Sequence, residues 1–144
     1  MKPQLLALIT AIAWGVGGFF EKRGLHAGNL TPQVGITIRT AVALVILGAV
    51  SFPQWKSIPQ AGTKALLMMV IGGGVVAGSV GMLSFYAAIR GADSLTQVMP
   101  IAFTSPLFSA LMGLLFRTER LSWQTVVGMV LTIAGIVVLT STSH

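Results

Sequence analysis

The chain has 144 residues, of which 54% are hydrophobic and only 8% charged, and its mean hydropathy is +0.88. A soluble domain of this length would normally carry about three times that charged fraction, so the composition excludes an ordinary soluble globular domain. The cations behind the net charge of +6 lie singly or in pairs in the loops, so no basic stripe is available to bind a nucleic-acid backbone. Basic loops of this kind instead set the orientation of membrane helices and contact anionic lipid headgroups.

Five long apolar runs fill almost the whole chain, and short loops with basic residues, glycine or proline separate them. The runs are Leu5–Phe20, Val34–Phe52, Ala65–Ala88, Val98–Phe116 and Trp123–Leu139. A helix needs about 20 mostly apolar residues to cross a bilayer, whereas barrel strands need an alternating polarity that these runs lack. The sequence therefore predicts an all-α, polytopic membrane protein: one domain, residues 1–144, with transmembrane helices at about 4–22, 32–52, 64–89, 95–116 and 122–140.

The first run has two possible interpretations. Lys2, the apolar stretch after it and Ala11-Ile12-Ala13 together resemble a signal peptide with its cleavage site. The run nevertheless continues to Phe20 and stops only at the charged residues Glu21-Lys22-Arg23, as a retained transmembrane helix would. We therefore favour a retained helix.

Small residues recur at every fourth position in two of the runs. Ala7, Ala11 and Gly15 do so in the first run, and Gly74 and Gly78 form a GxxxG pair in the third. This spacing places a smooth groove on one face of a helix, where another backbone can approach closely. We expect these five residues to lie in helix-packing faces.

Arg39 is the only ionisable residue inside an apolar run. It lies roughly 10 Å into the second predicted helix, where a charge in lipid is costly, so its head must reach water, a carboxylate or a ligand. Up-and-down topology places Glu21 and Asp93 on the same side of the membrane as Arg39, and Glu119 on the other. Two roles stay open: a structural pair or headgroup contact, and a substrate-facing cation whose ligand would carry a carboxylate or phosphate.

Glycine and proline mark irregular places in the third and fourth runs. The triplet Gly72–Gly74 indicates either dense packing from several sides or a hinge. Pro100 and Pro106 each remove a backbone donor, so we expect a kinked fourth helix whose freed carbonyls are satisfied by hydroxyls such as those of Thr104 and Ser105. Such a kink near the midplane is typical of transporter binding sites.

Aromatic residues fall at the ends of several runs, where rings favour the headgroup level. Their simplest role is that of interfacial anchors: Phe52, Trp55, Tyr86, Phe116 and Trp123.

Residues that could carry catalysis or hold a metal are scarce. The chain has no cysteine, and its two histidines are His26 in the first loop and the terminal His144. Neither a nucleophile–base pair nor a metal shell can be assembled from them. We expect no enzymatic activity, no metal and no cofactor.

Several motifs, weak singly but specific in their order, resemble a single EamA domain of the drug/metabolite transporter superfamily over nearly the whole chain. An aromatic–Ala helix end, a proline-bearing helix, an acidic Glu-Arg-Leu loop and a final glycine-bearing helix follow one another as in that family. The matching residues are Trp14-Gly15, Phe19, Phe20, Lys22, Arg39, Phe85-Tyr86-Ala87-Ala88-Ile89-Arg90, Pro106, Phe116-Arg117-Thr118-Glu119-Arg120-Leu121, Gly128 and Gly135.

The resemblance implies half of a transporter. Most members carry two such domains in tandem, giving ten helices, whereas this chain is closest to the five-helix bacterial and archaeal group. The related four-helix multidrug proteins use a glutamate within their first helix, and here no acid precedes Glu21 at the end of that run. Proton-coupled export of cationic drugs is therefore not expected.

An odd number of crossings places the two termini on opposite sides of the membrane, so two copies of opposite orientation would form the inverted pair typical of alternating access. Our first expectation is an antiparallel homodimer, and the second is a separately encoded partner half. The loop cations slightly favour a cytoplasmic N-terminus in an inner membrane. They are Lys2, Lys56, Lys64, Arg117 and Arg120 on the N-terminal side, against Lys22, Arg23 and Arg90 on the other.

Together these features predict a dimeric carrier that moves a small anionic or zwitterionic metabolite. Arg39 would recognise the anion, Trp14 and Tyr86 would form aromatic walls, and Pro100, Ser105 and Pro106 would shape the site from the fourth helix. Two alternatives are a non-transporting accessory membrane subunit and a flippase for a lipid-linked phosphate.

Overall fold

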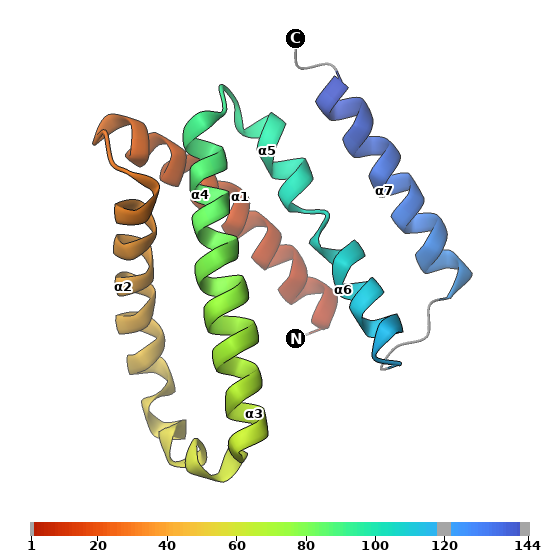
Figure 1. The fold of residues 1–144 in the computed structure, drawn as a ribbon. Helices are drawn as coiled ribbons and strands as arrows, with labels where there is room; N and C mark the ends of the chain where they lie inside the picture. The colour runs from red at the N-terminus through yellow and green to blue at the C-terminus, as the bar shows by residue number, and fades with distance from the viewer. Residues whose placement is uncertain (1, 118–121, 142–144) are drawn as a thin grey trace. The chain divides into compact units, whose positions relative to one another are not determined.

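The computed structural model describes residues 2–117 and 122–141. This part of the chain contains helices and no strand (Figure 1). Five helical stretches in it are long and apolar enough to cross a membrane: Pro3–Ala27, Pro32–Ser57, Thr63–Gly91, Leu95–Leu115 and Trp123–Ser141. The predicted all-α, multi-pass fold with five transmembrane helices is confirmed.

The chain divides into two compact units at Gly91. The first contains α1 (Pro3–Ala27), α2 (Pro32–Ser51), the short 3₁₀ helices η1 (Phe52–Ser57) and η2 (Pro59–Ala61), and a long helix made of α3 (Thr63–Met68), η3 (Met69–Gly81) and α4 (Met82–Gly91). The second contains α5 (Leu95–Ala102), α6 (Ser105–Leu115) and α7 (Trp123–Ser141).

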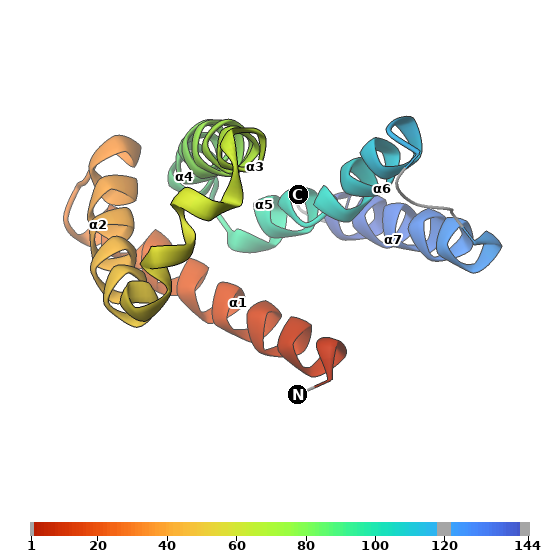
Figure 2. The same ribbon diagram turned by 90° about the horizontal axis from the view of Figure 1, so that it is seen from below.

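In the first unit, α2 and the long helix that ends in α4 run side by side in opposite directions, and α1 packs against both near its own C-terminal end (Figures 1 and 2). The described residues before Gly17 in α1 are all exposed, whereas Gly18 and Leu25 are buried. Ile36, Tyr86 and Ile89 complete the apolar core of this unit. The three helices are therefore tied together at the end that carries the α1–α2 loop.

The first helix is longer than expected. We expected it to end near residue 22, but α1 continues through Glu21, Lys22 and Arg23 to Ala27. Charged residues do not by themselves end a helix. The end comes where Asn29 takes a left-handed conformation with φ of 46°, after which the Thr31 hydroxyl caps α2 by accepting from the Val34 amide. This shift places Glu21 inside the helix.

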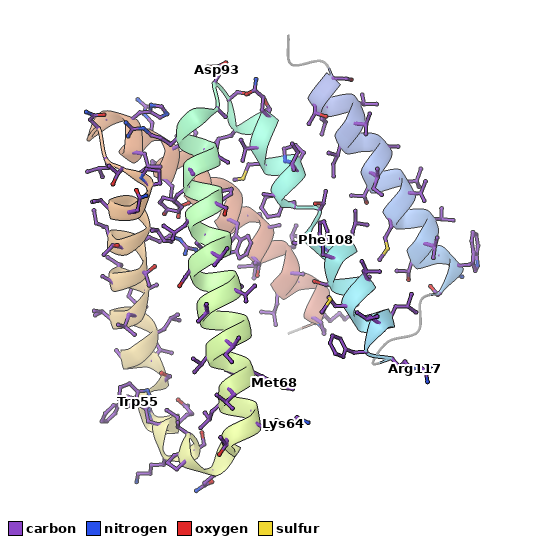
Figure 3. The ribbon with its side chains drawn as sticks, viewed as in Figure 1. Trp55, Lys64, Met68, Asp93, Phe108 and Arg117 are labelled. Atoms are coloured by element: carbon purple, nitrogen blue, oxygen red, sulfur yellow. The ribbon has the colours of Figure 1, made fainter. Side chains whose placement is uncertain are left out.

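The other end of the first unit is a turn made of η1 and η2. Proline near the start of each short helix and Gly62, with φ of 79°, redirect the chain into α3. The Trp55 indole N–H donates to the Ser51 hydroxyl at 3.0 Å and the Trp55 ring lies beside Phe52, so Trp55 is fixed at this end, where Figure 3 also labels Lys64.

The glycine triplet lies in a wide π-helix, η3, which replaces the expected α-helix over 13 residues. A π-helix bonds residue i to i+5 and is rare beyond one turn. The Ser79 hydroxyl donates to the Gly74 carbonyl five residues earlier at 3.0 Å, and a Cβ at Gly78 would lie 2.8 Å from the Gly73 carbonyl oxygen. Dense packing around the triplet is not seen, because a Cβ at Gly72 or Gly73 would meet nothing within 4 Å, while a hinge stays a prediction.

The fourth transmembrane stretch is broken rather than smoothly kinked. α5 ends at Ala102 and α6 begins at Ser105, with Pro106 in its first turn and Pro100 inside α5. The Thr104 hydroxyl donates to the Ile101 carbonyl at 2.7 Å, so a hydroxyl satisfies a backbone acceptor at the break, as the sequence predicts. Within this second unit α7 packs along α5.

Candidate functional site

The charged centre of the first unit is an ion pair between two helices. Nε of Arg39 on α2 lies 2.9 Å from Oε1 of Glu21 on α1. The Arg39 side chain is 38% exposed in the isolated chain and that of Glu21 is 22% exposed. The pair is therefore half-buried, with more of the arginine than of the carboxylate left accessible.

Tyr86 of α4 completes this centre. Tyr86 is 1% exposed, and its hydroxyl lies close enough to the Glu21 carboxylate and to Arg39 to interact electrostatically with both. Glu21, Arg39 and Tyr86 thus bring one polar side chain from each of the three packed helices to one place. We call these three residues the polar cluster.

A glycine on α2 makes the polar cluster possible. Gly35 lies one helical turn before Arg39 and therefore on the same face of α2. A Cβ at Gly35 would lie 2.5 Å from Leu25 Cδ2 and 3.0 Å from the Tyr86 ring, closer than real contacts allow. Only glycine lets α2 approach α1 and α4 this closely.

A second arginine fastens the loop next to the polar cluster. Arg90, in the last turn of α4, donates from Nη1 to the carbonyls of Leu25, at 3.0 Å, and Leu30, and from Nη2 to Asn29 Oδ1 at 2.8 Å. Its guanidinium fork thereby bonds one carbonyl in the last turn of α1, that of Leu25, and one in the loop that follows, that of Leu30. Arg90 ties α4 to the α1–α2 loop independently of the ion pair.

The predicted site residues are divided between the two units. Arg39 and Tyr86 lie together in the polar cluster. Trp14 lies on the exposed part of α1 and is 55% exposed, while Pro100, Ser105 and Pro106 belong to the second unit. Binding of a substrate by any of these residues stays a prediction.

In the described part of the first unit, no other helix packs on the predicted packing faces. Ala7, Ala11 and Gly15 are exposed on α1, and a Cβ at Gly15 would meet nothing within 4 Å. In η3, the atoms nearest to a Cβ at Gly74 or Gly78 belong to the backbone of the same helix. Among the described residues of the first unit these faces are therefore uncovered, and their role as packing faces stays a prediction.

Three features of the site were missed in the sequence. Gly35 and Leu25 went unnoticed because their importance lies in a contact between distant helices, and the bonds of Arg90 to the α1–α2 loop were not foreseen from its place in a motif and among the loop cations. The spacing of Gly35 and Arg39 on one helical face was the signal that could have found the close approach. The pairing of Arg39 with Glu21, considered together with Asp93 and Glu119, is now assigned, while Glu119 lies outside the described residues.

No group of three or more His, Asp or Glu residues in the described ranges could hold a metal ion. The polar cluster pairs one cation with one anion and one hydroxyl. A guanidinium fork matches the geometry of carboxylates and phosphates, so the chemistry that Arg39 offers is the pairing of charges.

Comparison with known proteins decides the family. A family model described as the EamA-like transporter family matches residues 1–141. This chain belongs to the EamA-like transporter family. An uncharacterized protein of Methanocaldococcus jannaschii is 30% identical over 136 residues, which is 94% of this chain and 93% of that protein. No solved structure matches the chain.

Membership confirms the resemblance drawn from the motifs and places this EamA-like chain in the drug/metabolite transporter superfamily. Members of the family are transporters rather than enzymes. With five apolar helices, the EamA-like chain is a multi-pass protein of a lipid bilayer.

Proposed function

We propose that this EamA-like chain is one half of a carrier that moves a small anionic or zwitterionic metabolite across the inner membrane by alternating access, with no catalytic step. The observation that carries the proposal is the position of Arg39. It lies within a transmembrane helix, and its guanidinium is held toward the junction of three helices while 38% of the side chain stays exposed.

A charge inside a membrane-spanning helix is costly, and such residues usually pair with one another or mark a substrate path. Glu21 Oε1 lies at Nε of Arg39, and the guanidinium carries further N–H donors that suit a second carboxylate or a phosphate. Arg39 is the anion-recognising group in this proposal, and Tyr86 is the aromatic wall beside it. Trp14, Pro100, Ser105 and Pro106 are its further lining.

Two copies in opposite orientations form the complete carrier. Five crossings put the termini of one chain on opposite sides, so a second, inverted copy supplies the symmetry that alternating access uses. The exposed first four turns of α1, with their face of Ala7, Ala11 and Gly15, support a contact with that second copy. In one of the two copies, the loops richer in Lys and Arg face the cytoplasm, and the N-terminus of that copy is cytoplasmic.

Uptake into liposomes tests the substrate class. The purified chain is reconstituted and offered radiolabelled monocarboxylates, phosphate esters, amino acids and amines. We expect saturable flux of carboxylates or phosphates, which Arg39→Gln abolishes and Arg39→Lys reduces at least about tenfold because lysine lacks the planar fork. Lys56→Gln, in the distant turn, is the matched control and keeps the flux.

The same assay separates the alternatives. Loss of assembly in Arg39→Gln without a specific transport defect indicates a structural arginine. A stable monomer without flux for any compound indicates an accessory subunit. Flux that only polyprenyl or lipid phosphates inhibit indicates a flippase.

Reporters that are active on one side of the membrane, fused to each terminus, test the assembly. We expect the two termini on opposite sides and each terminus on both sides across the population. One fixed orientation contradicts the antiparallel homodimer and leaves a separately encoded partner half.

A further inference from the structure

Glu21, the acid of the polar cluster, was expected from the sequence at the end of the first helix. Because α1 continues to Ala27, Glu21 lies within a membrane-spanning helix and neutralises Arg39 when no substrate is bound. We propose that Glu21 is an internal counter-anion that the transported anion displaces from Arg39, and that the displaced carboxylate takes up one proton. This inference rests on the proposed function, since it needs Arg39 to recognise the anion.

The geometry of the pair allows displacement. The contact joins Arg39 Nε to Oε1 of Glu21 at 2.9 Å, and Arg39 is the more exposed partner. An incoming oxyanion can therefore approach the guanidinium from its accessible side and engage its N–H donors. The two anions compete for one cation.

The charge balance requires the proton. Before binding, Arg39 and Glu21 carry charges of opposite sign and the cluster is neutral. If a monovalent anion takes Arg39 and Glu21 stays ionised, an unpaired negative charge is left inside the bilayer, which is strongly unfavourable. One proton from water, forming an O–H bond on the Glu21 carboxyl, restores neutrality. Anion and proton then cross together.

The Tyr86 hydroxyl can hydrogen-bond to Glu21 in both its ionised and its protonated form. The hydroxyl lies beside the Glu21 carboxylate and can donate to it. A hydroxyl also has acceptor lone pairs, so it can accept from the protonated carboxyl once Arg39 is released. The displaced side chain keeps a partner in a place where an unpaired polar group is costly.

The other charged groups around Glu21 do not supply a second acid. On α1, Arg23 lies over the Phe19 ring, and Lys22 and His26 are the other titratable neighbours in sequence. On α4, Arg90 is held by the α1–α2 loop. Among the described residues, the ion pair of Arg39 is with Glu21, so the exchange involves one carboxylate and one proton.

Calorimetry on the purified full chain counts the protons. The ligand is methanesulfonate, a monovalent anion that does not itself titrate near neutral pH. It is titrated at about pH 7 in two buffers of different ionisation enthalpy, in uncharged detergent. We expect uptake of about one proton per anion bound. Glu21→Gln removes the competitor, and we expect it to bind about tenfold more tightly and without proton uptake, while Arg39→Gln does not bind.

Glu21→Asp is the control for a folding defect, because it changes the side chain at the same position and keeps the carboxylic acid. We expect this variant to retain proton uptake. All variants are compared as single peaks in size-exclusion chromatography. Binding by the wild type without proton uptake, or equal affinity of wild type and a well-folded Glu21→Gln, overturns the displacement while leaving anion recognition by Arg39 intact. No binding by either protein removes the recognition itself, and the proposed function of Arg39 falls with it.

The anion can come from water or from a lipid headgroup, and a further arm distinguishes them. Phosphatidylglycerol is added to the micelles in place of methanesulfonate. If the lipid blocks methanesulfonate and itself drives proton uptake that Glu21→Gln abolishes, the displacement stands with a lipid phosphate as the anion. If it does neither, the anion is water-soluble.

Discussion

Gly35 of α2 lies so close to Tyr86 of α4 that a Cβ atom on the glycine would be 3.0 Å from the tyrosine ring. The two residues come from helices that pack side by side, and the close approach brings Arg39, one turn further along α2, to Glu21. The polar cluster therefore depends on a residue that carries no functional group.

Replacing Gly35 with alanine should destabilise the first unit by about 1 to 3 kcal/mol, because the new methyl group overlaps Leu25 and the Tyr86 ring. Reversible unfolding in mixed micelles measures the change. Gly24→Ala on α1 is the control. A Cβ there meets nothing within 4 Å, and alanine's higher helix propensity should leave stability unchanged or slightly increased. Equal effects of the two substitutions would contradict the close approach.

Glu21 and Arg39 should be energetically coupled. In a double-mutant cycle with Glu21→Gln and Arg39→Gln, we expect a coupling energy of about 1 to 2 kcal/mol, reduced from that of a fully buried pair because both side chains are partly exposed. The double mutant should be more stable than the sum of the single changes predicts. Strict additivity would show that the two charges do not meet in the folded protein.

Tyr86 should contribute through both its hydroxyl and its ring. Tyr86→Phe keeps the buried ring and removes the hydroxyl that interacts with Glu21, so we expect a loss of about 1 kcal/mol. Tyr86→Ala also removes the ring and should cost about 3 to 5 kcal/mol. If the phenylalanine variant lost as much as the alanine variant, packing would not explain the burial of this residue.

Arg90 should control the opening of the α1–α2 loop. Arg90→Lys loses the fork that reaches Leu25, Leu30 and Asn29, and we expect the backbone amide of Leu30, bonded to the Leu25 carbonyl at 2.9 Å, to exchange its hydrogen faster. Hydrogen exchange with mass spectrometry over the loop peptides measures this. Arg23→Lys, whose arginine lies over the Phe19 ring, is the matched control and should leave the loop protected.

The π-helix η3 should tolerate a methyl group at one glycine and not at another. Gly78→Ala places a Cβ 2.8 Å from the Gly73 carbonyl oxygen, so the wide helix must shift and the unfolding temperature should fall. Gly74→Ala, with its nearest atom at 3.9 Å, should be neutral or stabilising. A lower unfolding temperature for Gly74→Ala than for Gly78→Ala would contradict the assigned geometry.

Much of the fold was predictable because the signals are local. Pro100 and Pro106 predicted an irregularity in the fourth transmembrane stretch, because a proline lacks the backbone N–H that a helix needs, whatever the tertiary structure around it. The end of α1 was not predictable from its charges. It depends on the left-handed backbone at Asn29 and on the loop that Arg90 secures from α4.

The sequence by itself determined the class of this protein: the length and apolarity of five runs require helices across a bilayer, whatever their mutual packing. Only the tertiary structure decided that Glu21 is the partner of Arg39 and that Gly35 lies against Tyr86. The physical reason lies in the solvent. In a water-soluble protein, an apolar stripe on a helix predicts which face is buried. In lipid, both faces of a helix are apolar, so the pattern of apolar residues does not predict which helices it contacts.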